Sequence, residues 1–236
     1  NAEARLLITF KEVHRIASLL TNQVSSLKAV VAADALADAP TAPIRSSGEA
    51  PALIQYTSGS TGQPKGVLLS NDNLMANIRS IESRLMITSQ DTAVSWLPLY
   101  HDMGLIGAWL GPLYAGVPLA LMSPLTFLAR PIRWLQALHT HRGTVSPAPN
   151  FAYDLCTTRI KDSELDGIDL SSVRILLNGS ETVLPDTLKR FISRFEPYGL
   201  TRNAILPVYG LAECSVGLAT PTPNTTPRID HVQWSH

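Results

Sequence analysis

The chain has 236 residues, and its 19 basic and 19 acidic side chains give a formal net charge of zero. A balanced charge excludes a general electrostatic attraction to nucleic acid or to an anionic membrane surface, so we expect no nucleic-acid partner. With 45% hydrophobic residues, the chain is long and apolar enough to bury a substantial core in one large domain or two small ones.

Two cysteines, Cys156 and Cys214, lie far apart among apolar neighbours. This argues against a disulfide framework and favours a reducing compartment, so we expect a cytoplasmic protein. No apolar run approaches the roughly 20 residues that cross a bilayer, and we expect no membrane span. The N-terminal stretch NAEARLLITF lacks the features of a signal peptide and begins abruptly with a strand-like run, which predicts a piece of a longer chain.

Short apolar runs alternate with amphipathic stretches along the chain, a pattern typical of βα units around a parallel sheet. The predicted strands are 6–9, 29–31, 53–56, 67–69, 92–97, 118–121, 144–146, 173–178 and 204–208. Apolar residues near a 3.6-residue spacing predict a helix over 71–86. The further predicted helices, each opening at a proline, are 131–139, 149–159 and 185–195.

The polar, proline-rich segment 36–50 predicts a loop. We place a coarse boundary near residue 88. Residues 1–88 would then hold part of a first αβ subdomain, residues 89–220 a second one, and residues 221–236 the start of a following segment. The predicted fold class is therefore α/β, with layered parallel sheets flanked by helices.

The segment YTSGSTGQPKGV, residues 56–67, follows a predicted strand and combines glycines, hydroxyl side chains and one lysine. A strand that leads into a glycine-rich turn can present backbone N–H groups to phosphate. The Walker pattern does not fit, because Gly59 and Gly62 are three residues apart and no hydroxyl residue follows Lys65. Alone, such a segment is compatible with a flexible linker, but the strands on both sides favour a phosphate-binding loop.

Four segments together resemble the adenylate-forming enzymes, a superfamily that includes acyl-CoA synthetases, adenylation domains of peptide synthetases and fatty acyl-AMP ligases. They are YTSGSTGQPKGV at 56–67, SWLPLYHDMGLIG at 95–107, LLNGSET at 176–182 and VYGLAECSVGLA at 208–219, in the family's order and spacing. The HDMGL and LAE forms most resemble the fatty acyl-AMP ligases. The resemblance implies part of the large N-terminal domain, built on flavodoxin-like sheets, without the family's small C-terminal lysine domain.

The resemblance implies roles for the first and the last of these segments in nucleotide binding. The first would wrap the ATP phosphates, with Lys65 at the pyrophosphate, and the last would pack Tyr209 on adenine and hold Mg²⁺ through Glu213. The residues implied to contact the nucleotide are Thr57, Ser58, Gly59, Ser60, Thr61, Gly62, Lys65, Gly179, Ser180, Glu181, Tyr209 and Gly210. The residues implied to act in catalysis are Lys65, His101 and Glu213. The residues implied to contact the acyl substrate are His101, Met103 and Asn178.

The implied reaction is ATP-dependent activation of a fatty acid to an acyl-adenylate with release of pyrophosphate. The acyl group would pass to an acyl carrier protein, as in the loading unit of a polyketide or peptide synthase, or to coenzyme A in an acyl-CoA synthetase. Ala212 stands where many relatives have a threonine that touches the α-phosphate, which leaves that contact in question. Because the family's ribose-binding aspartate and C-terminal lysine come later, we expect this chain alone to be inactive or nearly so.

Without the resemblance, each residue also has a simpler interpretation. His101 and Asp102 could mark a capped helix start, Tyr209 could be a core tyrosine, and Glu213 a surface residue after a strand. A noncatalytic nucleotide-binding module on the same fold therefore stays an alternative to the enzyme.

Overall fold

The computed structural model describes residues 3–36, 46–57, 64–230 and 232. The chain forms two compact units, Asn1–Ser47 and Gly48–His236. The boundary expected near residue 88, between two αβ subdomains, stays a prediction.

The first unit is a small βαβ arrangement. Its elements in chain order are β1 (Leu6–Thr9), α1 (Lys11–Ala17), a 3₁₀ turn (Ser18–Asn22), β2 (Ala29–Ala32) and a second 3₁₀ turn (Ala33–Ala35). The two strands pair in parallel, with Leu6 opposite Ala29, as the alternation of elements predicts. Two strands and one short helix cannot bury their apolar side chains, and Phe10 and Ile16 are largely exposed.

The second unit begins with a hairpin of β3 (Pro51–Thr57) and β4 (Lys65–Ser70). The strands are antiparallel, with Thr57 opposite Lys65, because so short a connection cannot make the crossover that a parallel pair needs. Helix α2 (Asn71–Leu85) follows β4 directly. Its start is a capping box, in which Ser70 and Asn73 each bond the other's backbone N–H.

A five-stranded sheet forms the centre of the second unit, and its strand order is β6-β5-β7-β8-β9. The strands are β5 (Ala93–Ser95), β6 (Leu119–Leu121), β7 (Val145–Ala148), β8 (Ile175–Asn178) and β9 (Ile205–Pro207). Every paired neighbour is parallel, which confirms the predicted α/β class. Parallel strands need helical crossovers, and these cover the faces of the sheet.

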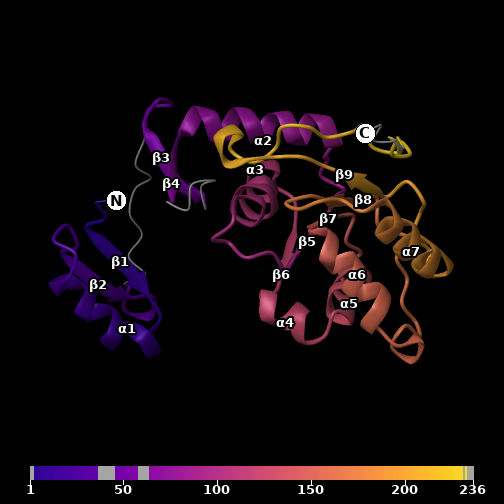
Figure 1. Cartoon of the computed structure of the whole chain (residues 1–236), viewed down its shortest axis with the longest axis horizontal. Helices are drawn as coiled ribbons and strands as arrows, with labels where there is room; N and C mark the ends of the chain where they lie inside the picture. The colour runs from indigo at the N-terminus through magenta and orange to yellow at the C-terminus, as the bar shows by residue number, and fades with distance from the viewer. Residues whose placement is uncertain (1–2, 37–45, 58–63, 231, 233–236) are drawn as a thin grey trace. The chain divides into compact units, whose positions relative to one another are not determined.

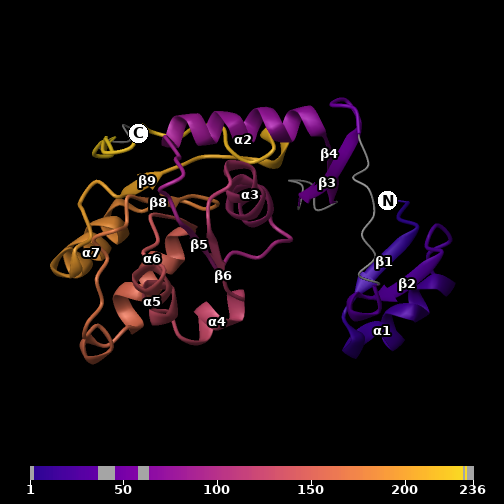
Figure 2. The same ribbon diagram turned by 180° about the vertical axis from the view of Figure 1, so that it is seen from behind.

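The helices between the strands lie on both faces. They are a π-helix η3 (Met103–Leu110), α3 (Gly111–Ala115), α4 (Pro124–Ala129), α5 (Ile132–Thr140), α6 (Asn150–Arg159) and α7 (Pro185–Phe195), with 3₁₀ turns at Asp162–Glu164, Glu196–Tyr198 and Ala212–Cys214. Figures 1 and 2 show α2 on one side of the sheet, and α4, α5 and α6 on the other. The core under α5–α7 is aromatic, since Trp134 contacts both Tyr153 and Phe191 ring to ring.

Most predicted elements of the second unit are confirmed within a few residues. Helices α5 and α6 begin one residue later than predicted, because Pro131 and Pro149 are their N-cap residues. The π-helix was not predicted, since MGLIGAWL is apolar on every side and shows no period. Both cysteines are free thiols, and a cytoplasmic location stays a prediction. Across the described residues, no helix combines the length and apolarity needed to cross a bilayer.

Candidate functional site

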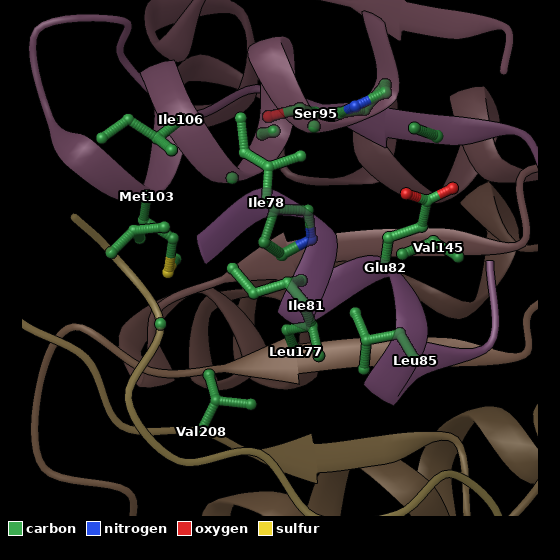
Figure 3. Close-up of a pocket in the computed structure, with 18 of the residues that line it drawn as sticks. Ile78, Ile81, Glu82, Leu85, Ser95, Met103, Ile106, Val145, Leu177 and Val208 are labelled. Atoms are coloured by element: carbon green, nitrogen blue, oxygen red, sulfur yellow. The ribbon is translucent and has the colours of Figure 1, made fainter. Parts of the chain in front are cut away.

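An apolar cavity of about 230 Å³ lies in the second unit. Its walls come from α2, from the sheet strands β5, β7 and β8, and from η3 and α3. In Figure 3, Ile78, Ile81 and Leu85 of α2 face Leu177 and Val208 across this space. A mainly apolar lining of this kind suits a hydrocarbon chain better than a polar ligand.

Three motifs far apart in the sequence meet at the cavity. Its lining includes His101 and Met103 from the second motif, Ser180 from the third, and Tyr209 and Gly210 from the fourth. The other predicted site residues do not line it: among the described ones these are Thr57, Lys65, Asn178, Gly179, Glu181 and Glu213. The tertiary structure therefore brings together one part of the predicted site around the cavity.

His101 forms a close pair with Asp102 at the start of η3. Its Nδ1 lies 2.8 Å from Oδ1 of Asp102, and the same oxygen accepts a hydrogen bond from the Met103 backbone N–H at 2.6 Å. Asp102 is thus the N-cap that the simpler interpretation expected, and His101 lines the cavity as well. The hydrogen bond to Asp102 raises the pKa of His101, although partial burial acts in the opposite direction.

The turn after β8 holds the LLNGSET motif. A Cβ atom on Gly179 would lie 2.9 Å from the carbonyl oxygen of Val208, so the close approach of two strand ends requires glycine there. Ser180 has a left-handed backbone with φ of 68°, and its hydroxyl lies 3.1 Å from the Met103 sulfur. This contact joins the second and third motifs at the cavity wall.

Two other residues of this motif, Glu181 and Asn178, make hydrogen bonds within the protein. Oε1 of Glu181 accepts a hydrogen bond from the Phe151 backbone N–H at 2.6 Å, which places a negative charge at the N-terminus of α6. Asn178 is fully buried, and its Nδ2 donates to Oδ1 of Asn150 at 3.3 Å. The contact of Asn178 with a substrate stays a prediction, and the geometry gives it no support.

The fourth motif forms a tight loop beside α2. Tyr209 pairs with Ala219 by two backbone hydrogen bonds of 2.9 Å, and the residue as a whole is 63% exposed. A Cβ atom on Gly210 would lie 1.7 Å from the carbonyl oxygen of Val216, so no other residue fits. Glu213 is exposed, and among the described residues its carboxylate has no hydrogen-bond or ion-pair partner.

The phosphate loop is described only at its two ends. Thr57 and Lys65 face each other across the hairpin, where the Thr57 hydroxyl lies 3.5 Å from the Lys65 carbonyl oxygen. The Lys65 side chain is exposed. The predicted phosphate contacts of Ser58, Gly59, Ser60, Thr61 and Gly62 lie outside the described residues.

Sequence reasoning missed the contribution of α2 to the site. The 3.6-residue spacing of Ile78, Ile81 and Leu85 predicts an apolar face, but not that this face lines a cavity. The spacing is the only signal in the sequence, and it is the same for a helix packed on a closed core.

The family profile of AMP-binding enzymes matches residues 1–234. The chain belongs to the AMP-binding enzyme family. The match confirms the family resemblance that the four motifs indicate.

Individual relatives within the AMP-binding family are fatty-acid ligases. A long-chain-fatty-acid–AMP ligase of Mycobacterium marinum is 46% identical over 182 residues, which cover 75% of this chain and 31% of the relative. A medium-chain-fatty-acid–[acyl-carrier-protein] ligase of Moorena producens is 45% identical over 169 residues, which cover 72% of this chain and 28% of the relative.

A solved structure of the same kind has the same fold. The fatty acyl-adenylate ligase from L. pneumophila, in complex with acyl adenylate and pyrophosphate, superimposes with a TM-score of 0.85 at 34% identity. The superposition covers 94% of this chain and 39% of the ligase. This AMP-binding chain thus spans about a third of the length of these relatives.

Proposed function

We propose that the complete protein containing this chain activates a fatty acid as its acyl-adenylate. The observation that supports this most directly is the apolar cavity lined by His101, Ser180 and Tyr209, residues of three adenylate-forming motifs. A cavity of about 230 Å³ offers an apolar environment to an alkyl chain, and each buried methylene contributes about 0.8 kcal/mol to binding.

In the proposed reaction, a carboxylate oxygen of the fatty acid attacks the α-phosphorus of ATP. A new P–O bond forms, the bond from the α-phosphorus to the bridging oxygen breaks, and pyrophosphate leaves with that electron pair. A carboxylate is already ionised at neutral pH and needs no general base. The protein's task is therefore to orient the two substrates and to stabilise the charge on the leaving group.

Two of the described residues, Tyr209 and Lys65, have side chains whose chemistry suits ATP binding. Tyr209, an exposed residue, offers an aromatic ring for stacking on adenine, and Lys65 offers an exposed ammonium group for the leaving pyrophosphate. Lys65 also bounds the predicted phosphate loop, whose residues Ser58 to Gly62 would supply backbone N–H groups.

Glu213 fits a magnesium ligand, because its carboxylate is exposed and without a partner within the described part of the chain. Mg²⁺ favours one or two protein carboxylates together with phosphate oxygens. When bound, the ion would neutralise phosphate charge during the transfer. Phosphate oxygens of the substrate would supply further ligands of the ion.

The acyl acceptor is proposed to be an acyl carrier protein. The relative from Moorena producens is named as an acyl-carrier-protein ligase, and the HDMGL and LAE forms agree with that branch. Coenzyme A is the alternative acceptor. Incubating the complete protein with ATP and a fatty acid, together with either CoA or a phosphopantetheinylated carrier protein, distinguishes the two.

The activation step is tested by fatty-acid-dependent exchange of labelled pyrophosphate into ATP, measured on the complete protein. We expect Lys65→Met and Glu213→Gln each to lower the exchange rate at least about 100-fold, because each removes charge stabilisation of the transferred group. The matched controls are Lys189→Met and Asp186→Asn, which break only an exposed ion pair on α7. Wild-type exchange in both site variants would remove the catalytic roles of Lys65 and Glu213. Absence of exchange by the complete wild-type protein would leave the noncatalytic module as the better explanation.

The isolated 236-residue chain is proposed to exchange poorly or not at all, because it spans only about a third of the length of the fatty-acid ligases that it matches. Exchange by the isolated chain at the rate of the complete protein would refute this.

A further inference from the structure

Asn77 of α2 makes a two-way hydrogen-bonded contact with the backbone of Gly217, 140 residues later in the chain. Its Nδ2 donates to the Gly217 carbonyl oxygen at 2.7 Å, and its Oδ1 accepts from the Gly217 N–H at 3.0 Å. A side-chain amide that satisfies both backbone groups of one residue fixes the position and the orientation of that residue.

Two further contacts continue this attachment along α2. A Cβ atom on Gly217 would lie 2.9 Å from Cδ1 of Ile81, so the loop lies directly on the helix. One turn on, Nε of Arg84 donates to the carbonyl oxygen of Thr220 at 2.9 Å. Figure 1 shows this C-terminal segment, drawn in yellow, running along α2. Asn77, Ile81 and Arg84 thus form a row that holds residues 217–220.

Several backbone contacts close the loop between Tyr209 and Ala219. Its ends are joined by the Tyr209–Ala219 pair, and Gly210 lies against the Val216 carbonyl oxygen. Ser215 has φ of 67° and ψ of −65°, a γ-turn closed by the Val216 N–H on the Cys214 carbonyl oxygen at 2.9 Å. A non-glycine residue in this conformation is strained and persists only where its surroundings hold it.

Helix α2 also connects this loop to the β3–β4 hairpin. β4 starts at Lys65 and passes at Ser70 into α2 through the capping box, without an intervening loop. A helix is a rigid element, so a shift at Asn77 changes the distance between Lys65 and the loop that bears Tyr209 and Glu213.

We propose that Asn77 is a positioning residue for nucleotide binding. It holds the strained Tyr209–Ala219 loop, through Gly217, at a set position relative to the strand that begins at Lys65. This inference rests on the proposed function, since that function gives Tyr209, Glu213 and Lys65 their roles toward ATP.

The test compares Asn77→Asp, Asn77→Ala and Gly217→Ala in the complete protein. Asn77→Asp keeps the side-chain shape and the oxygen that accepts from the Gly217 N–H, but it replaces the donor to the Gly217 carbonyl oxygen by an oxygen. Gly217→Ala adds a Cβ atom that would push the loop away from Ile81 and leaves Asn77 unchanged. We expect each variant to raise the Kd and the KM for ATP about tenfold, the scale of one or two net hydrogen bonds. In Asn77→Ala, the Gly217 amide should exchange with deuterium at least about tenfold faster.

The control is Ser80→Ala, an exposed α2 residue, which should leave all these values within about twofold of wild type. A purely structural role for Asn77 would reduce the amount of folded enzyme, so the apparent kcat would fall at unchanged KM and Kd. That result in both Asn77 variants, or wild-type Gly217 exchange in Asn77→Ala, would overturn the inference. Measuring direct ATP binding to the wild-type protein separates the two proposals. If the protein binds ATP but shows no fatty-acid-dependent exchange, only the proposed function is refuted. If it does not bind ATP, both proposals are refuted.

Discussion

Arg174 forms a two-pronged ion pair with Asp91, with Nη2 to Oδ2 at 2.8 Å and Nε to Oδ1 at 3.1 Å. Its guanidinium also donates to the carbonyl oxygens of Leu85 and Met86, at 2.9 and 3.3 Å. These carbonyls end α2, so the ion pair anchors the C-terminal end of the helix that lines the cavity.

The first prediction concerns this pair. Arg174→Met leaves the Asp91 carboxylate buried beside the cavity with only Thr88 and Thr144 as hydrogen-bond donors, and we expect the free energy of unfolding to fall by about 3 kcal/mol. Arg202→Met is the matched control, because it breaks an exposed pair with Glu196 and should cost at most about 1 kcal/mol. Urea unfolding measures both, and equal losses would show that the Arg174 pair is no more than a surface contact.

The second prediction is acid sensitivity from the same carboxylate. Burial acts to raise the pKa of Asp91, but the hydrogen bonds from Arg174, Thr144 and Thr88 outweigh it and hold the pKa below its usual value. The stabilisation is therefore complete above the unfolded-state pKa of about 3.9 and is lost as the pH falls through the lower folded-state value. Unfolding titrations should show a smaller loss of stability below about pH 4 in Asp91→Asn than in wild type. Identical acid profiles would contradict this origin.

The third prediction tests the cavity as an acyl site. Apart from the backbone of its own helix and its two chain neighbours, no described residue has a heavy atom within 4 Å of a Cβ atom placed on Gly107. This glycine lines the cavity, so a larger side chain would meet open space. Gly107→Leu should shift fatty-acid preference toward shorter chains, with a KM about fourfold higher for each methylene displaced. Gly107→Ala should show a smaller shift in the same direction. Pyrophosphate exchange with a series of fatty acids measures the shift, and an unchanged preference in both variants would place the acyl chain elsewhere.

The fourth prediction concerns the titration of His101. The pair with Asp102 stabilises the protonated imidazole, so its contribution is fully present below the unfolded-state pKa of about 6.5 and is lost as the pH rises through the raised folded-state pKa. Asp102→Asn should lower the pKa of His101, while asparagine still serves as N-cap of η3. An NMR titration of the imidazole resonances measures this. An unchanged His101 pKa would show that Asp102 does not charge-pair with it.

The sequence alone predicted the elements whose signals are local. Helix α2 has a capping residue and a clear apolar period, α7 opens at Pro185, and β8 contains the apolar run ILL. The bounds of each were therefore predicted within two residues. The family was also predictable, because four motifs in a set order define it without knowledge of contacts. The π-helix was missed because an apolar segment without a period does not reveal its backbone geometry.

Contacts between distant segments depended on the tertiary structure. It decided that the apolar face of α2 lines a cavity, that Gly179 and Gly210 are required by close approaches of the backbone, and that Asn77 bonds Gly217. The motifs name the residues of a site, since the chemistry depends on residue type. The distances between these residues, and the hydrogen bonds that hold them, are set only when the sheet brings strand ends together and α2 packs across them. Hydrogen bonds and packing depend on proximity in space and not on proximity in sequence.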